Sequence, residues 1–202
     1  GPSMDNEYGI DHYVSDLSEL IELLGVSDVV LIGHSMGGRI SIKYTLANQD
    51  RVKGLVLISA SGAPRDQEGS RPLALRMMGS RIGRFLIKRI WSRNMARRSL
   101  EDMVFDKSSI SDKEVDRMWD LSRYPGNMDA MFREFTDSWA DFDPAEVRAI
   151  ATDTLLIWGE EDTVCPLSMG VWYDSLIPNA TLVRLPKVGH NPQFECPGGC
   201  LE

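Results

Sequence analysis

A strand that runs directly into a glycine-rich turn and then into a helix constrains this chain more than any other feature. The apolar residues 29–32 (Val-Val-Leu-Ile) precede Gly-His-Ser-Met-Gly-Gly at 33–38, and a helical pattern follows. So sharp a turn forces its central residue, Ser35, into a strained backbone conformation. We expect Gly33 and Gly37 to let the strand and the helix pass close to each other. The pattern predicts a nucleophilic serine at the tip of the turn, rather than an ordinary glycine-rich connection.

Apolar runs and helical patterns alternate along the rest of the chain. Buried strands are predicted at residues 29–32, 52–59, 154–158 and 180–185. Helical spacing marks residues 11–24, the stretch from the turn to about residue 48, and residues 166–177. Strands that alternate with helices in this way form parallel sheets through right-handed crossovers. The sequence therefore predicts an α/β fold with a mostly parallel sheet of these four strands.

Residues 64–145 interrupt this alternation with helical patterns alone. One helix is expected at residues 112–124, behind a capping box formed by Ser111 and Glu114, and another at residues 128–139. We expect this stretch to be a helical cap over the carboxyl ends of the strands, where ligand pockets of such sheets lie. The expected division is core at 5–63 and 146–197, cap at 64–145, and cloning remnants at 1–4 and 201–202.

The cap region carries concentrated positive charge in a chain whose net charge is −8. Residues 71–98 contain no acidic side chain and nine basic ones: Arg71, Arg76, Arg81, Arg84, Lys88, Arg89, Arg93, Arg97 and Arg98. Apolar residues recur among them at helical spacing: Leu75, Met78, Ile82, Phe85, Leu86 and Ile90. We favour a lid helix whose apolar face covers a pocket and whose basic side chains lie in water or pair with acids. The alternative is an amphipathic helix on an anionic membrane surface.

A serine nucleophile needs a base, and the base needs a group that orients it. Of the three histidines, His12 lies on the first predicted helix, and His34 lies on the wrong side of the turn to reach the Ser35 hydroxyl. His190 follows the last predicted strand, in a loop at its carboxyl end, and we expect it to be the base. Carboxylates compete as its partner in the loop after the third strand: Glu160, Glu161 and Asp162. Their positions along the chain do not decide among them.

Residues 29–38, 159–166 and 189–192 resemble the elbow, the acid loop and the histidine loop of the α/β-hydrolase superfamily. The order of serine, acid and histidine along the chain is also the order found in that superfamily. Within it, the chain is most similar to meta-cleavage-product hydrolases and related carboxylesterases. The resemblance implies a triad of Ser35, Asp162 and His190, with the Met36 N–H as an oxyanion donor. Asn191 stands where that subfamily often has an aromatic residue, which argues against a C–C bond substrate.

The resemblance covers residues 8 to 197 but only part of the family's fold. The strands that precede the elbow strand in the family are missing from the sequence, and so is the loop among them that supplies a second oxyanion donor. The last family helix, which would follow Pro197, is missing as well. We therefore expect a partial α/β-hydrolase fold in which the strand at 29–32 is a bare apolar edge. Such an edge would promote self-association.

Together these features predict a serine hydrolase that cleaves a small apolar ester or related carbonyl compound through an acyl-enzyme. The alternative is a catalytically impaired hydrolase scaffold that binds a ligand or self-associates. No metal, organic cofactor or nucleic-acid partner is implied. The three cysteines show no metal-ligand spacing, and we expect a reducing, cytoplasmic location: Cys165, Cys196 and Cys200.

Overall fold

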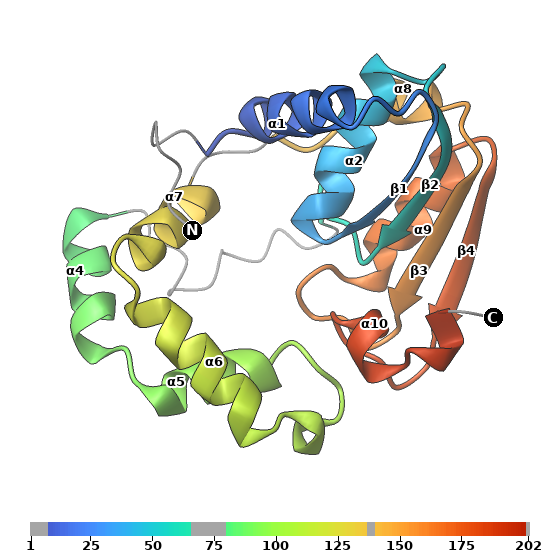
Figure 1. Ribbon diagram of the computed structural model, residues 1–202. Coiled ribbons are helices and arrows are strands. Elements are labelled where there is room, and N and C mark those ends of the chain that lie inside the picture. The colour runs from blue at the N-terminus through green and yellow to red at the C-terminus, as the bar shows by residue number, and fades with distance from the viewer. Residues whose placement is uncertain (1–7, 66–79, 137–139, 201–202) are drawn as a thin grey trace.

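Four parallel strands form one sheet in the order β1-β2-β3-β4 (Figure 1). The strands are β1 (Val29–His34), β2 (Val52–Ile58), β3 (Thr154–Gly159) and β4 (Ala180–Leu185). This computed structural model describes residues 8–65, 80–136 and 140–200. The α/β class and the parallel sheet predicted from the sequence are confirmed. Because the strands are parallel, their carboxyl ends lie at the same end of the sheet, where a binding site is expected.

Helices cover one face of this sheet. They are α1 (Ile10–Leu23), α2 (Met36–Ala47), α8 (Pro144–Arg148) and α9 (Leu167–Leu176). Side chains from these helices and from the strands form the main hydrophobic core, in which Trp158, Tyr44 and Tyr173 are fully buried. The Trp158 indole donates its N–H to the carbonyl oxygen of Cys165 at 2.8 Å, so its polar atom is satisfied inside the core.

The opposite face of the sheet is only partly covered. A smaller apolar cluster lies there beside the short helix α10 (Pro192–Glu195): Ile58, Ile157, Leu185 and Val188. Ile32 of β1 is in register with Val56, which packs against this cluster. Yet Val30 and Ile32 are 61% and 69% exposed. Within the described residues no strand pairs with the outer side of β1, so the elbow strand is an open edge as expected.

Between β2 and β3 lies a group of helices that we call the helical segment. It contains α4 (Arg81–Ile90), α5 (Arg93–Glu101), η1 (Lys107–Ser109), α6 (Asp112–Arg123) and α7 (Asn127–Thr136). Helices α4 to α7 gather apart from the sheet (Figure 1). The predicted capping box of Ser111 and Glu114 begins α6 with both of its hydrogen bonds. Residues 137–139 of the helix predicted at 128–139 lie outside the described residues.

The basic stretch that the sequence pattern suggested as one helix is broken in two. Helix α4 ends before Trp91, whose backbone is extended with ψ 127°. The Ser92 hydroxyl then accepts a hydrogen bond from the Met95 N–H and starts α5 as its N-cap. Four residues of the predicted pattern lie outside the described ranges: Arg71, Leu75, Arg76 and Met78.

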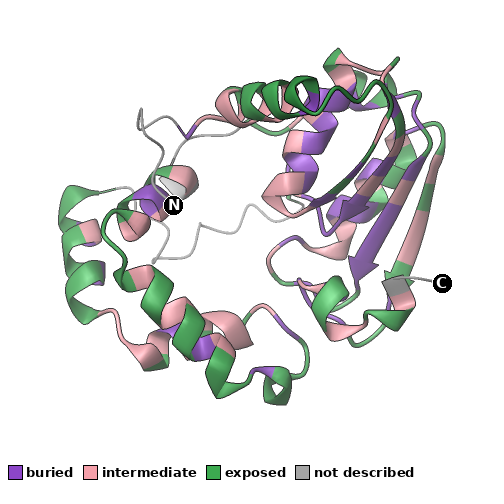
Figure 2. Ribbon diagram, in the orientation of Figure 1, coloured by how far each residue is buried: buried purple, intermediate pink, exposed green. Residues whose placement is uncertain are grey.

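The expectation that α4 covers a pocket with its apolar face is wrong. Its apolar side chains at Ile82, Phe85, Leu86 and Ile90 are exposed (Figure 2). Only Gly83 and Ile87 of this helix are buried. No helix in the described part of the chain is long and apolar enough to cross a bilayer.

The open edge of β1 is expected to cause self-association of the protein. We expect the chain to form dimers or larger species at micromolar concentration, because β1 combines unpaired backbone groups with exposed Val30 and Ile32. Ile32→Lys should shift the population to monomer, since a lysine on an edge strand opposes strand pairing. Analytical ultracentrifugation of both proteins measures this effect. Thr181→Lys, an exposed change on the opposite edge strand β4, is the matched control. A wild type that stays monomeric at every concentration contradicts the prediction.

Candidate active site

Ser35 lies at the turn between β1 and α2 with φ 52° and ψ −117°. A positive φ at a residue other than glycine is strained, by on the order of 1–3 kcal/mol. Two backbone hydrogen bonds hold the turn in place: the Ser35 N–H donates to the Ile58 carbonyl at 3.0 Å, and the Ser61 N–H donates to the Ser35 carbonyl at 3.1 Å. The strand β2 and the loop after it therefore fix the elbow from one side.

Glycines make the close approach at this elbow possible, but not the pair expected from the sequence. A Cβ atom at Gly33 would lie 2.5 Å from the Gly37 carbonyl oxygen, so no larger residue fits without a backbone shift. A Cβ atom at Gly38 would lie 2.5 Å from the Cβ of Ala60. At Gly37 an added Cβ would meet no atom within 4 Å. The steric requirement therefore falls on Gly33 and Gly38, because the position of Gly37 faces open space.

The structure brings Ser35, Asp162 and His190 together in one hydrogen-bonded chain. His190 Nε2 lies 3.0 Å from Ser35 Oγ, and His190 Nδ1 lies 2.9 Å from Asp162 Oδ2. The side chain of Asp162 is fully buried, and that of His190 is 4% exposed. With Nδ1–H donated to the carboxylate, Nε2 is left as an acceptor for the serine proton. This arrangement can support nucleophilic attack by Ser35.

Burial distinguishes Asp162 from the two glutamates beside it. Its second carboxylate oxygen, Oδ1, accepts hydrogen bonds from the N–H groups of Val164 and Cys165, both at 2.8 Å. Glu160 and Glu161 are exposed. Of these three carboxylates, Asp162 is the one that contacts the histidine ring, so the choice that the residues alone left open is decided by the fold.

Glu195 holds the histidine loop in place through hydrogen bonds, a role that the sequence analysis did not predict. Its carboxylate accepts hydrogen bonds from the N–H groups of Gly189 at 2.9 Å and Asn191 at 3.3 Å, on either side of His190. It also accepts from the Phe105 N–H of the helical segment, at 2.7 Å. The only signal in the sequence is a carboxylate in the first turn of a helix that begins with Pro192. That signal is too common to indicate a role.

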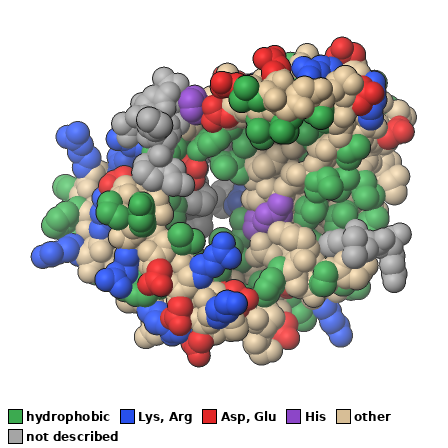
Figure 3. Space-filling view, in the orientation of Figure 1, with side chains coloured by type: hydrophobic (Ala, Val, Ile, Leu, Met, Phe, Trp, Pro, Cys, Tyr) green, Lys and Arg blue, Asp and Glu red, His purple; other side chains and the backbone are tan. Residues whose placement is uncertain are grey.

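The helical segment also reaches the histidine loop directly. The His190 N–H donates to the Met103 carbonyl oxygen at 2.8 Å. A Cβ atom at Gly189 would lie 2.8 Å from the same oxygen, which explains the glycine at this crossing. The position of the base is thus set jointly by the loop after β4 and by the helical segment. Figure 3 shows a hollow between these two parts, with a purple histidine side chain at its wall.

His34 supports the same loop and does not act on Ser35. Its Nε2 lies 2.7 Å from the His190 carbonyl oxygen, and the two rings are 4.8 Å apart between centroids. Because a carbonyl oxygen only accepts, Nε2 must carry a hydrogen and donate it. Burial lowers the pKa of His34 below its usual value of 6.5, although the hydrogen bond to His190 opposes that shift. His34 is therefore expected to be neutral at pH 7.

Cys165 lies close to the acid but is not a second nucleophile. Burial, and then the charge of Asp162, raise the pKa of its thiol to about 12. The thiol therefore keeps its proton at neutral pH and serves as part of the core. Across the described ranges, no three His, Cys, Asp or Glu side chains are grouped in a way that would hold a metal ion.

Comparison with known proteins places this geometry in a family. A family model described as alpha/beta hydrolase fold matches residues 1–197. The protein named "Uncharacterized hydrolase YugF" of Bacillus subtilis is 32% identical over 173 residues, which are 85% of this chain and 62% of the relative. The 2-hydroxy-6-oxo-2,4-heptadienoate hydrolase of Pseudomonas putida is 25% identical, over 93% of this chain and 66% of its own length. The chain thus spans less than two thirds of these relatives.

Solved structures agree on the fold. The meta-cleavage product hydrolase of Pseudomonas fluorescens aligns with a TM-score of 0.81 at 22% identity, covering 100% of this chain and 72% of the other. A thermophilic esterase of Thermogutta terrifontis aligns with a TM-score of 0.69 at 23% identity, covering 92% of this chain and 66% of the other. Because the family model matches residues 1–197, which is nearly the whole chain, the chain belongs to the α/β-hydrolase family.

Proposed function

We propose that this protein is a serine hydrolase in which Ser35, His190 and Asp162 act as a catalytic triad. The observation that carries the proposal is the hydrogen-bonded chain from the Ser35 hydroxyl through both ring nitrogens of His190 to a buried carboxylate. The strained backbone of Ser35 and its place between a strand and a helix support the same role. Family membership makes hydrolysis the expected chemistry.

In the proposed reaction, Ser35 Oγ attacks the carbonyl carbon of an ester while His190 Nε2 takes the hydroxyl proton. The tetrahedral intermediate collapses when the C–O bond to the alcohol breaks and His190 returns the proton to the leaving alcohol. A water molecule, deprotonated by the same nitrogen, then attacks the acyl carbon. Its proton passes through His190 to Ser35, and the carboxylic acid leaves. Asp162 stabilises the imidazolium that forms in each half of the reaction.

The oxyanion is expected to bind at the start of α2. Met36 is the first residue of this helix, so its N–H has no acceptor within the helix. The positive end of the helix dipole favours negative charge at the same point. An oxyanion donor of this kind contributes about 10²–10³ to turnover.

An apolar carbonyl compound is the substrate class that we propose. Helices α5 to α7 line an open cavity of about 510 Å³, whose walls include polar side chains such as Glu114 and Glu134 and the apolar residues Leu100, Met118, Leu121, Met128 and Met131. Flexible methionine side chains fit apolar groups of varied shape. We propose that residues 64–145 act as a cap and that this cavity accepts the apolar part of the substrate. An ester is favoured over a C–C bond substrate, because Asn191 follows the histidine.

A second candidate is a hydrolase scaffold with impaired catalysis. The edge of β1, which no other described strand pairs with, favours it. On this alternative the site would bind an ester without turning it over. Measurement of Ser35-dependent turnover distinguishes the two candidates.

Ser35→Ala should abolish hydrolysis of p-nitrophenyl butyrate, because the nucleophile is removed. We expect kcat to fall by about 10⁴-fold or more. Release of p-nitrophenolate, followed by absorbance, measures the rate. Ser175→Ala, which removes an exposed hydroxyl on α9, is the matched control and should leave the rate unchanged. If the Ser35→Ala protein hydrolyses the ester as fast as the wild type, the proposal is wrong.

Asp162→Asn should lower kcat on the order of 10³–10⁴-fold with little change in KM, because an amide cannot hold His190 in the useful tautomer. Glu160→Gln and Glu161→Gln are matched controls on the same loop and should stay within about twofold of the wild type. The same absorbance assay measures all three proteins. Equal losses from all three substitutions would contradict a specific role for Asp162.

The lowered pKa of His34 predicts a loss of stability in acid. As pH falls below 6.5, the unfolded chain takes up a proton at His34 that the folded chain resists, so the free energy of unfolding falls. His34→Gln keeps an N–H donor but does not titrate, and its free energy of unfolding should fall less between pH 7.5 and pH 5.5. Urea unfolding at the two pH values measures this, with His12→Gln on α1 as control. Parallel losses in the wild type and His34→Gln would refute the assignment.

A further inference from the structure

Helix α4 presents a surface that the proposed catalytic function does not use. Four large apolar side chains project from it, and their exposed fractions are 75% for Ile82, 61% for Phe85, 45% for Leu86 and 59% for Ile90. Three of them recur at steps of four residues and so lie along one face of the helix. A contiguous exposed patch of this kind marks an interaction site rather than ordinary scatter. We call these four residues, with Arg81, Arg84 and Arg89, the α4 surface.

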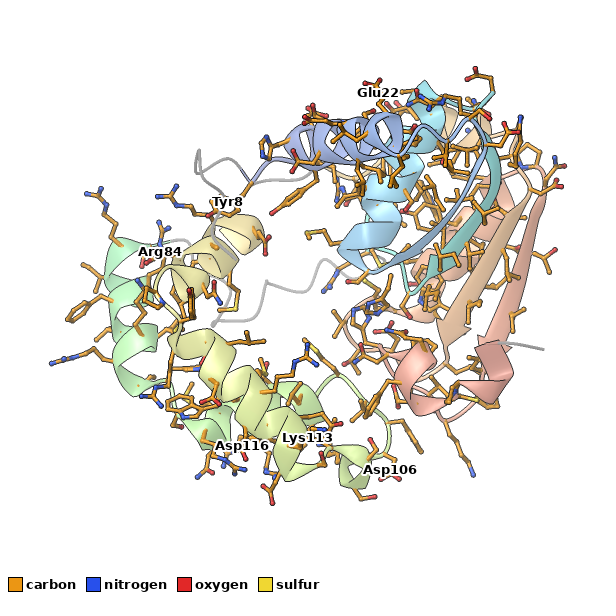
Figure 4. The ribbon with its side chains drawn as sticks, viewed as in Figure 1. Tyr8, Glu22, Arg84, Asp106, Lys113 and Asp116 are labelled. Atoms are coloured by element: carbon orange, nitrogen blue, oxygen red, sulfur yellow. The ribbon has the colours of Figure 1, made fainter. Side chains whose placement is uncertain are left out.

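Basic side chains without acidic partners border this patch. Within the described ranges, Arg81, Arg84 and Arg89 form no ion pair with a carboxylate, whereas Lys88 pairs with Asp129 at 2.5 Å. The guanidinium of Arg89 lies over the Phe85 ring, 5.8 Å from its centroid. Blue and green side chains accordingly alternate over α4 in Figure 3, and Figure 4 labels Arg84 on this helix.

On the neighbouring helix α5, by contrast, two of the three arginines have carboxylate partners. Arg93 contacts Asp112 at 2.7 Å and Asp116 at 2.6 Å, and Arg97 contacts Asp112 at 2.7 Å. The charges of Arg93 and Arg97 are thus balanced within the helical segment. Among the described residues, no carboxylate balances Arg81, Arg84 and Arg89 in this way.

The charge of the whole molecule decides what kind of partner fits. A second copy docked on the same surface would bring two sets of arginines together, which is unfavourable. An anionic lipid surface would attract the arginines and repel the rest of a chain whose net charge is −8, so only this face would approach it. The apolar side chains would then enter the boundary between headgroups and acyl chains, as in an interfacial amphipathic helix.

We infer that the α4 surface binds an anionic phospholipid bilayer. Ile82, Phe85, Leu86 and Ile90 insert at the interface, and Arg81, Arg84 and Arg89 contact lipid phosphates. The exposed apolar side chains of β1, Val30 and Ile32, lie instead on the open edge of the sheet, beside unpaired backbone groups. This edge therefore suits a second strand rather than a membrane surface. This inference is independent of whether Ser35 is a nucleophile.

Sedimentation with vesicles tests the inference. We expect the protein to bind vesicles of phosphatidylglycerol and phosphatidylcholine at low salt, to bind pure phosphatidylcholine far less, and to be released as salt is raised. Each arginine at an anionic surface contributes about fivefold to partitioning, so Arg84→Gln with Arg89→Gln should weaken binding about 25-fold. Phe85→Ser should weaken binding to both kinds of vesicle. Ile32→Ser, the same kind of change on the open edge of β1, is the matched control and should bind like the wild type.

Circular dichroism of each variant establishes that it is folded, so a loss of binding can be assigned to the surface. Equal binding to anionic and neutral vesicles, or binding that Arg84→Gln with Arg89→Gln leaves unchanged, would overturn the inference. So would a wild type that does not sediment with either kind. If Phe85→Ser instead lowers the molar mass of the protein in the absence of vesicles, the surface is an interface between copies and the lipid assignment is wrong.

Discussion

The close contact of backbones at the elbow is the constraint on which the rest of the site depends. Ser35 adopts φ 52° because β1 must turn at once into α2, and Gly33 and Gly38 leave just enough room for the turn. This places the hydroxyl at the end of the sheet where the loops after β3 and β4 also arrive. A similar contact recurs there, since a Cβ atom at Gly159 would lie 2.2 Å from the Gly189 carbonyl oxygen. The Ser35, His190 and Asp162 side chains can meet because the segments that carry them approach closely at these glycines.

Much of the fold could be predicted because its signals are local. Runs of apolar residues marked all four strands, and the alternation with helices indicated their parallel arrangement. His190 could be selected by its place after the last strand. The choice of Asp162 could not be made from spacing alone, because it depends on which carboxylate the fold buries against the histidine ring. The roles of Glu195 and His34 likewise depend on two loops crossing, and no local pattern encodes such a crossing.

For helix α4, helical structure could be predicted from the sequence, but the exposure of its apolar face could not. Apolar periodicity predicted one helix in the basic stretch, and residues 81–90 are helical, but the pattern showed neither the break at Trp91 nor what the apolar face meets. The structure packs only Gly83 and Ile87 against neighbours and leaves the larger side chains open. The exposed apolar side chains of β1 and of α4 therefore differ in character: those of β1 lie on a sheet edge with unpaired backbone groups, and those of α4 lie beside arginines. Backbone pairing and charge, which the apolar pattern does not describe, separate their expected partners.

The central claim is that Ser35 is an activated nucleophile in this fold, and covalent labelling tests it most directly. The protein is treated with a fluorophosphonate, which reacts with a serine hydroxyl only when a neighbouring base activates it, and the modified residue is identified by peptide mass spectrometry. The account predicts one phosphonyl group, carried by Ser35. An unmodified protein, or a phosphonyl group on another serine such as Ser61 while Ser35 stays free, would contradict it.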